Sequence, residues 1–147
     1  KVQLIVSGGI RSGADVAKAM AMGADAVSIG SAAMIALNCN ADMYPEDYEK
    51  LGTAAGYCHH CHTGKCPVGV ATQDPELEKR LEPELAGKRV KNYLATLTLE
   101  LQTLARANGK SDVRNLEPED LAALTVEAAA MARVPLAGTN WIPGHEL

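Results

Sequence analysis

Three cysteines stand close together in the middle of the chain and constrain it more than any other feature. Cys58, Cys61 and Cys66 fall within nine positions of a 147-residue sequence, and the fourth cysteine, Cys39, lies upstream. The spacing Cys-x2-Cys-x4-Cys-Pro is closer to an iron–sulfur binding run, which ends in Cys-Pro, than to a zinc finger. Thiolates are soft ligands that suit both iron and zinc. The run therefore predicts a metal site.

Composition narrows the classes of function. The chain has the size of one domain and an ordinary globular makeup, with 47% hydrophobic and 22% charged residues. Its net charge is −4 and no basic cluster is present, which argues against nucleic acid as a partner. No apolar run approaches the ~18 residues of a membrane span, so we expect no membrane association. Clustered cysteines in a chain of this makeup indicate metal or redox chemistry in the cytoplasm rather than disulfides.

Residues 1–38 alternate short apolar runs, glycine turns and helical patterns. Residues 2–7 and 25–30 predict two short buried strands. Ser12 starts a capping-box pattern for a helix between them, and residues 31–37 predict a second helix. The order strand, helix, strand, helix predicts an α/β fold with a parallel sheet and a right-handed crossover. Because the chain opens directly in a strand pattern, we expect it to be a piece of a longer protein.

Two short helices are predicted around the cysteine run. Pro45 opens one of them, which continues through Glu49 inside a polar excursion at residues 40–57. Asp74 and Pro75 have the pattern of an N-cap followed by proline at the first helical position. We therefore expect the cysteine-rich segment to be a loop between short helices.

The C-terminal part is predicted to be helical and then extended. Apolar residues that recur every three or four positions predict the longest helix, from about Gly87 to Ala107, after an interruption at Pro83. The pattern is short for a coiled coil, so we expect this helix to pack on its own domain. Thr125 caps a shorter helix, and the proline- and glycine-rich tail at residues 134–147 is typical of an extended arm.

A glycine turn follows each predicted strand. Gly8-Gly9 follows the first strand and Gly30-Ser31 follows the second. In a parallel arrangement both turns lie at the carboxyl ends of adjacent strands, which is where ligands bind. Glycine lets the backbone approach an anion, and the helix N-terminus adds free N–H groups. The pair of turns predicts a phosphate site, and the alternative is that the glycines only make tight turns.

Two segments resemble known families. The string at residues 7–31 resembles the last two βα units of FMN-dependent TIM (β/α)8 barrels, and the run at residues 61–75 is similar to the iron–sulfur segment of the glutamate synthase synthase domain. The second resemblance is the more specific, and it continues over nearly the whole chain. In FMN barrels the backbone of the two turns holds the flavin phosphate. The contacts that this resemblance implies are Gly8, Gly9, Gly30 and Ser31.

The resemblance implies a fold class and a division of the chain. The fold is α/β, the C-terminal βαβα portion of a TIM (β/α)8 barrel of the FMN-dependent type, followed by a cysteine-rich cluster loop and a helical C-terminal extension. Residues 1–38 are the last two βα units of the barrel. Residues 39–73 are the iron–sulfur segment with an insertion, and residues 74–147 are the helical cap and arm.

The resemblance also implies a cofactor at the cysteines. In glutamate synthases three cysteines with the spacing Cys-x5-Cys-x4-Cys hold a [3Fe-4S] cluster beside the flavin, and Cys61 and Cys66 match the last two. Either Cys39, which is separated from them by the excursion, or Cys58 completes the set. The resemblance favours [3Fe-4S], while four thiolates are enough for [4Fe-4S]. A structural zinc held by the cysteines, or with one neighbouring histidine, is the chemical alternative.

The implied activity belongs to a larger enzyme. Glutamate synthases reduce 2-iminoglutarate, formed from 2-oxoglutarate and glutamine-derived ammonia, to L-glutamate with FMN and an iron–sulfur cluster. Their electrons come from ferredoxin or an electron-donor subunit, so we expect a larger assembly. Alternatives are another FMN-dependent barrel, such as N-methylglutamate synthase, or a zinc-stabilised interaction module without redox activity. Because only two of the eight βα units of a barrel are found here, we expect no synthase activity from this chain alone and assign no catalytic residues.

Overall fold

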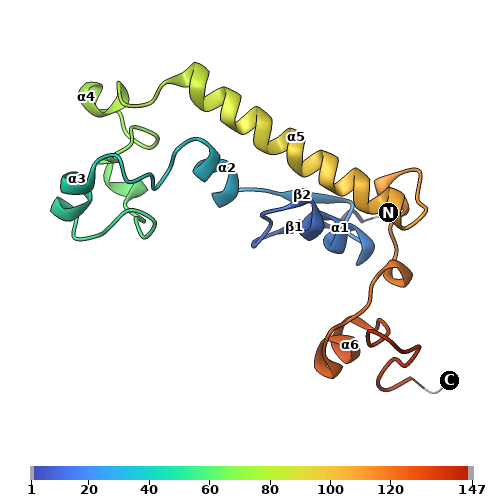
Figure 1. Ribbon diagram of the computed structural model, residues 1–147. Helices are drawn as coiled ribbons and strands as arrows, with labels where there is room; N and C mark the ends of the chain where they lie inside the picture. Colours follow the sequence, from blue (N-terminus) through green and yellow to red (C-terminus); the bar gives the residue numbers. More distant parts are fainter. Residues whose placement is uncertain (1, 146–147) are drawn as a thin grey trace. The chain divides into compact units, whose positions relative to one another are not determined.

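The computed structural model describes residues 2–145, which fall into two units (Figure 1). Unit 1 combines the N-terminal residues up to 29 with the segment from residue 96 onward. Unit 2 comprises residues 30–95, the middle of the chain. The division falls inside the long helix α5 (Pro83–Ala107). Within the described residues the chain is a mixed α/β structure with few strands and many helices, as the α/β prediction requires in its general form.

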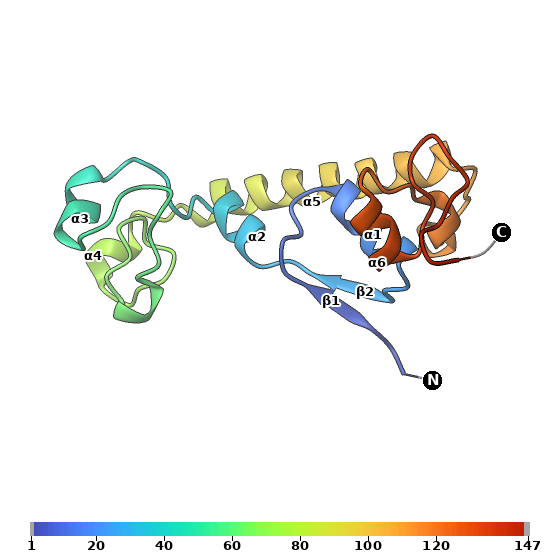
Figure 2. The same cartoon turned by 90° about the horizontal axis from the view of Figure 1, so that it is seen from below.

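The two predicted strands form a parallel pair in unit 1. β1 (Ile5–Ser7) lies beside β2 (Ala26–Ser28), and Ser7 stands opposite Ser28 in the register (Figure 2). Both strands are shorter than predicted, but their parallel pairing is confirmed. Their carboxyl ends therefore lie at the same edge, immediately before the two glycine turns.

The prediction that these strands are buried is wrong for the described residues. Ile5 is 67% exposed, and Leu4 next to it is exposed as well. Parallel sheets normally have both faces covered by other elements. In residues 2–145 the sheet has only two strands, so the apolar side chains of β1 find no covering layer.

Helix α1 (Gly13–Ala21) begins with the predicted capping box. The Asp15 amide donates to Ser12 Oγ at 3.3 Å, and the Ser12 amide donates to Asp15 Oδ2 at 3.2 Å. These bonds satisfy donors that a helix start otherwise leaves free. The helix buries Val16 and Ala17, and it contacts the 3-10 turn η2 (Val113–Asn115).

Helix α5 packs against the start of α1 within unit 1. Leu97 and Leu101 are buried, in agreement with the prediction that this helix packs on its own domain. The helix begins at Pro83 rather than near Gly87. The predicted interruption at Pro83 is wrong, because proline lacks only an N–H that the first helical position does not use.

The C-terminal segment folds back on itself. It contains a second 3-10 turn, η3 (Pro118–Asp120), and helix α6 (Val126–Ala132), which Thr125 caps through the Ala128 amide as predicted. The extended-arm prediction is wrong where the tail pairs with Ala123. The Ala123 amide donates to the Pro135 carbonyl at 2.8 Å, and the Ala137 amide donates to the Ala123 carbonyl at 2.8 Å. These bonds supply backbone partners that an arm would lack, and residues 146–147 of the predicted arm lie outside the described residues.

Unit 2 is built from short helices around the cysteine segment. They are α2 (Ser31–Ala36), α3 (Pro45–Lys50), the 3-10 turn η1 (Cys61–Thr63) and α4 (Pro75–Glu78). The helices predicted at Pro45 and at Asp74-Pro75 are confirmed. No helix among residues 2–145 has the length and apolar character that crossing a membrane requires.

Candidate metal centre and phosphate-binding turns

The polar excursion at residues 40–57 is a loop closed at its base. The Cys58 amide donates to Asn40 Oδ1 at 2.9 Å, and Asn40 Nδ2 donates to the Cys58 carbonyl at 3.3 Å. The Gly56 amide adds a bond to the Asn40 carbonyl at 3.2 Å. The excursion therefore leaves the chain and returns to the same place, which brings Cys39 and Cys58 to the two ends of one closure.

The backbone reverses on both sides of Cys39. Asn38 has a φ of 86° and Asn40 a φ of 63°, the left-handed region that asparagine tolerates better than most side chains. The Cys39 amide donates to the Met34 carbonyl at 3.0 Å, which ties it to the end of α2. Two asparagines thus present Cys39 between helix α2 and the excursion. The sequence analysis missed them, although Asn-Cys-Asn is a visible signal for such a turn.

A small apolar core includes one of the cysteines and contacts another. It is formed by Tyr48, Cys66 and Val68, and Cys58 packs against it. Tyr48 is 1% exposed, and its hydroxyl donates to the Ala41 carbonyl at 2.9 Å. Burial, followed by the charges of the nearby cysteines, raises the pKa of Tyr48 to about 12. The excursion therefore contributes a buried, uncharged side chain, Tyr48, to the packing around the cysteine segment.

All four predicted cysteines lie in unit 2. Burial raises the pKa of the Cys39 thiol, and the charges of Cys61, Cys66 and Cys58 raise it further. Cys66 is buried, Cys61 is exposed, and the other two are half-buried. The four thiols therefore lie in the same unit, and which of them meet at one site stays a prediction.

The spacing of these side chains bears on the kind of metal. Within residues 2–145, no group of three or more His, Cys, Asp or Glu side chains is arranged to hold a metal ion. A structural zinc needs four ligands around one point, and this geometry supports neither the zinc alternative nor the iron–sulfur cluster. In an iron–sulfur cluster the thiolates bind different irons. Which cysteines are ligands stays a prediction.

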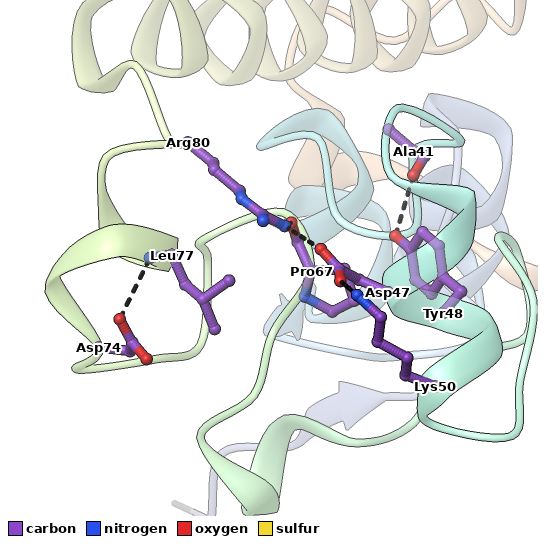
Figure 3. A network of polar contacts seen from close by, with 8 residues as sticks. All are labelled: Ala41, Asp47, Tyr48, Lys50, Pro67, Asp74, Leu77 and Arg80. Carbon is purple, nitrogen blue, oxygen red and sulfur yellow. Dashed lines mark hydrogen bonds and ion pairs between the residues drawn. The ribbon is translucent and has the colours of Figure 1, made fainter.

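Arg80 contacts both the cysteine segment and the excursion. Its Nη1 donates to the Pro67 carbonyl at 2.8 Å and to Asp47 Oδ2 at 2.7 Å (Figure 3). Its guanidinium carbon also lies 4.1 Å from the centre of the Tyr44 ring. Lys50 and Arg80, in that order, hold the pKa of the Asp47 carboxyl below its usual value. Sequence reasoning missed this network because its members are far apart in the chain.

Gly69 allows α4 to approach the cysteine segment closely. Its φ is 77°, and a Cβ there would lie 2.5 Å from the Leu77 carbonyl oxygen. Asp74 caps α4 by accepting from the Glu76 amide at 2.9 Å and the Leu77 amide at 3.4 Å (Figure 3). The chain after Cys66 therefore folds back tightly, and this places Arg80 against Pro67.

The first glycine turn is open, whereas the helix start behind it is occupied. Gly8 and Gly9 have φ values of 100° and 70°, and a Cβ on either would meet nothing within 4 Å. The Arg11 amide donates to Asp15 Oδ2 at 3.0 Å, and the Gly13 amide donates to Glu100 Oε2 at 2.7 Å. Two carboxylates therefore use the donors that would attract an anion to α1.

At the second glycine turn, no carboxylate among residues 2–145 caps the helix that follows. Gly30 is the N-cap residue of α2, Ser31 is its first residue, and no side chain caps this helix. Gly8 and Gly9 belong to unit 1, while Gly30 and Ser31 belong to unit 2. A joint role for the four residues in binding phosphate therefore stays a prediction. The carboxylate of Glu100 at α1 carried no signal in the sequence.

Comparison with known proteins identifies the family. A family model described as a conserved region in glutamate synthase matches residues 1–111, about three-quarters of the chain. The chain belongs to the glutamate synthase family. The matched region contains all four cysteines and both glycine turns, so the resemblance to glutamate synthase is confirmed.

Relatives within the glutamate synthase family cover the same region. A "glutamate synthase large subunit-like protein" of Rhizobium meliloti (strain 1021) is 65% identical over 144 residues, which are 98% of this chain and 33% of the relative. An "archaeal glutamate synthase (NADPH)" of Methanocaldococcus jannaschii is 44% identical over 116 residues, 79% of this chain and 20% of the relative.

A more distant member of the family comes from a plant. A "ferredoxin-dependent glutamate synthase, chloroplastic" of Oryza sativa subsp. japonica is 41% identical over 106 residues, 72% of this chain and 6% of the relative. The chain therefore spans a third or less of the length of these glutamate synthase relatives.

Proposed function

We propose that the chain is part of a glutamate synthase-like flavoenzyme. The complete enzyme reduces 2-iminoglutarate, formed from 2-oxoglutarate and glutamine-derived ammonia, to L-glutamate, with electrons from ferredoxin or a donor subunit in a larger assembly. Family membership supports this proposal, and the structural observation that carries it is the closed excursion, which ties Cys58 to Asn40, the residue after Cys39. Four free cysteines also fit a reducing compartment, the cytoplasm.

The proposed parts follow the chain in order. Residues 1–38 are the last two βα units of an FMN-dependent TIM barrel, residues 39–73 carry the iron–sulfur cluster, and residues 74–147 form a helical cap. The exposed apolar side chains of β1 support the first assignment, because parallel strands are normally covered on both faces. Six more βα units would supply the missing strands and helices of a barrel.

The glycine turns are proposed to hold the flavin phosphate. Gly8 and Gly9 form an open turn, and α2 begins after Gly30 without a capping side chain, so backbone N–H groups of Gly8, Gly9, Gly30 and Ser31 fit an anion. The carboxylates at α1 disfavour a phosphate at that helix start.

The cysteines are proposed to hold the cluster. Cys61 and Cys66 bind it together with Cys39 or Cys58, in a [3Fe-4S] cluster or, with all four, in [4Fe-4S]. The bonds between Asn40 and Cys58 fit either choice, because they keep Cys39 and Cys58 at the two ends of the same closure. When bound, the FMN supplies hydride and the cluster supplies single electrons.

Metal and flavin analysis of the full-length protein tests the proposal. Protein prepared without oxygen is expected to contain iron, acid-labile sulfide and FMN. Zinc without sulfide would contradict the proposal and favour the interaction module. Cys39→Ser and Cys58→Ser then identify the third ligand, because only the variant that removes a ligand loses the cluster. Loss of iron from both variants would indicate four ligands, and supplying methylamine in place of ammonia tests for N-methylglutamate formation.

A further inference from the structure

Arg80 connects three stretches of unit 2 through one guanidinium. Its Nη1 bridges Asp47 of α3 and the carbonyl of Pro67, the residue that follows Cys66, and its face lies over Tyr44. The side chains of Arg80 and Asp47 are only 26% and 27% exposed. The neighbouring pair of Lys79 with Glu76 is 69% and 81% exposed. Exposed ion pairs of that kind contribute little to stability. Of these two ion pairs, the one between Arg80 and Asp47 therefore has the greater capacity to hold the local structure in place.

The contacts of Arg80 suit a guanidinium. Its Nη1 donates to two oxygens while the planar group lies over an aromatic ring, and a compact lysine ammonium lacks that planar face. The position of Arg80 is also constrained from behind, because α4 lies against Gly69 and is capped by Asp74. The backbone that carries Arg80 is therefore held in place, with the guanidinium against the Pro67 carbonyl.

We propose that Arg80 is a positioning residue for the iron–sulfur cluster, which holds the backbone beside Cys66 and raises the reduction potential of the cluster. This inference rests on the proposed function. Partners outside the ligands orient them, and their loss typically weakens metal binding ~10–100-fold. A nearby positive charge stabilises the reduced cluster, which carries one more electron than the oxidised one. The carboxylate of Asp47 opposes that charge.

Opposite charge changes at Arg80 and Asp47 give the decisive test. In the full-length protein, Arg80→Gln leaves the Asp47 carboxylate paired, among the described residues, with Lys50 alone, so the cluster potential is expected to fall. Asp47→Asn leaves the guanidinium uncompensated, so the potential is expected to rise. Lys79→Gln removes one positive charge from the adjacent exposed position and serves as the matched control, with the potential unchanged.

The rate of cluster loss to a chelator measures the positioning role. Arg80→Gln is expected to lose iron ~10-fold faster or more, and Arg80→Lys, which keeps the charge without the planar fork, is expected to lose iron at an intermediate rate while retaining most of the potential. Circular dichroism confirms that each variant is folded. If Arg80→Gln does not fold, the proposal is tested by the other two variants. A rise in the cluster potential of Asp47→Asn and faster iron loss from Arg80→Lys support the role of Arg80, and their absence overturns it.

The outcomes separate this inference from the function on which it rests. A wild-type protein without iron and sulfide overturns the proposed function, and the role of Arg80 with it. A wild-type cluster whose potential moves in the same direction in both charge variants, or in neither, overturns the role of Arg80 alone. Opposite shifts with an unchanged Lys79→Gln support it.

Discussion

The amide of Gly13 donates a hydrogen bond to Glu100 Oε2 over 2.7 Å, so a carboxylate of α5 caps the first turn of α1. A negative group at a helix N-terminus is favourable, because the backbone dipoles leave partial positive charge there. A Cβ at Gly13 would lie 2.5 Å from both the Leu97 carbonyl oxygen and the Leu101 amide nitrogen. The two helices therefore meet backbone to backbone at this glycine.

Replacing Gly13 with alanine is expected to destabilise unit 1. The added methyl group would meet backbone atoms of α5, which cannot move aside as a side chain would. Overpacking of this kind costs about 1–3 kcal/mol or more in free energy of unfolding, measured by urea titration. Gly87→Ala is the matched control, because it lies in α5 with open space around its Cβ. It is expected to stabilise by up to about 1 kcal/mol, and equal effects of the two changes would refute the packing argument.

Removing the Glu100 carboxylate is expected to weaken the contact between α5 and α1. Glu100→Ala loses a hydrogen bond to a charged acceptor, which contributes about 1.5–3 kcal/mol. Glu100→Gln keeps an acceptor oxygen and loses only the charge, so its cost is expected to be smaller. Urea unfolding of both variants gives the comparison. A Gln variant as unstable as the Ala variant would show that charge alone matters.

Acid is expected to weaken the start of α1 through Asp15. A hydrogen bond from Lys18, then the backbone N–H of Arg11, lowers the pKa of Asp15 to about 2. Because the folded pKa is below the unfolded value of 3.8, this contribution to stability is full above about pH 4 and is lost as the pH falls towards 2. The unfolding midpoint measured against pH should therefore drop over this range, and Asp15→Asn should flatten that part of the curve.

Alkali is expected to act through Tyr48. Its pKa of about 12, raised by burial, lies above the unfolded value of 10, so the neutral phenol favours the folded state below about pH 10. That contribution is lost as the pH rises through 12. Tyrosinate absorbance should show one late-titrating group that disappears in Tyr48→Phe. Tyr57→Phe, at an exposed position, should leave the late group in place.

Cutting the bonds between Asn40 and Cys58 is expected to open the base of the excursion. Asn40→Gly tolerates the left-handed φ of 63° while removing both side-chain hydrogen bonds, so its effect reports the bonds rather than backbone strain. Alkylation of Cys58 in the metal-free protein should become faster, as followed by mass spectrometry. An unchanged rate, with Cys61 as the internal reference, would mean that the closure does not restrain Cys58.

Local signals in the sequence were sufficient for the strand pairing and for the starts of α1, α3, α4 and α6, but not for the start of α5 at Pro83. The capping box of Ser12 at α1 and the Asp74-Pro75 N-terminus of α4 each involve residues within four positions of one another. Each can therefore be recognised from a short stretch of sequence. The parallel pair followed from the order of the elements. The burial of the strands could not be predicted, because it depends on layers that residues 2–145 do not contain.

The contacts that shape the candidate site act over long separations. Arg80 reaches Asp47 across 33 positions, and Gly13 meets Glu100 across 87 positions. Neither partner is recognisable from its neighbours, because an arginine in the turn after a short helix and a glutamate within a helix both have the pattern of solvated side chains. The cysteines could be identified because three of them are closely spaced in the sequence. The asparagines on both sides of Cys39 could not, because their role depends on their left-handed backbone conformation.

The closure at Asn40 has a consequence for the length of the excursion. A loop tied at its base leaves the chain on either side where it would be without the loop, and each doubling of loop length costs only ~0.6 kcal/mol in closure entropy. The excursion therefore tolerates changes in length without separating Cys39 from Cys58. Asp47 and Tyr48 lie inside this tolerant segment, so the partner of Arg80 and part of the apolar core come from residues that the closure itself does not constrain.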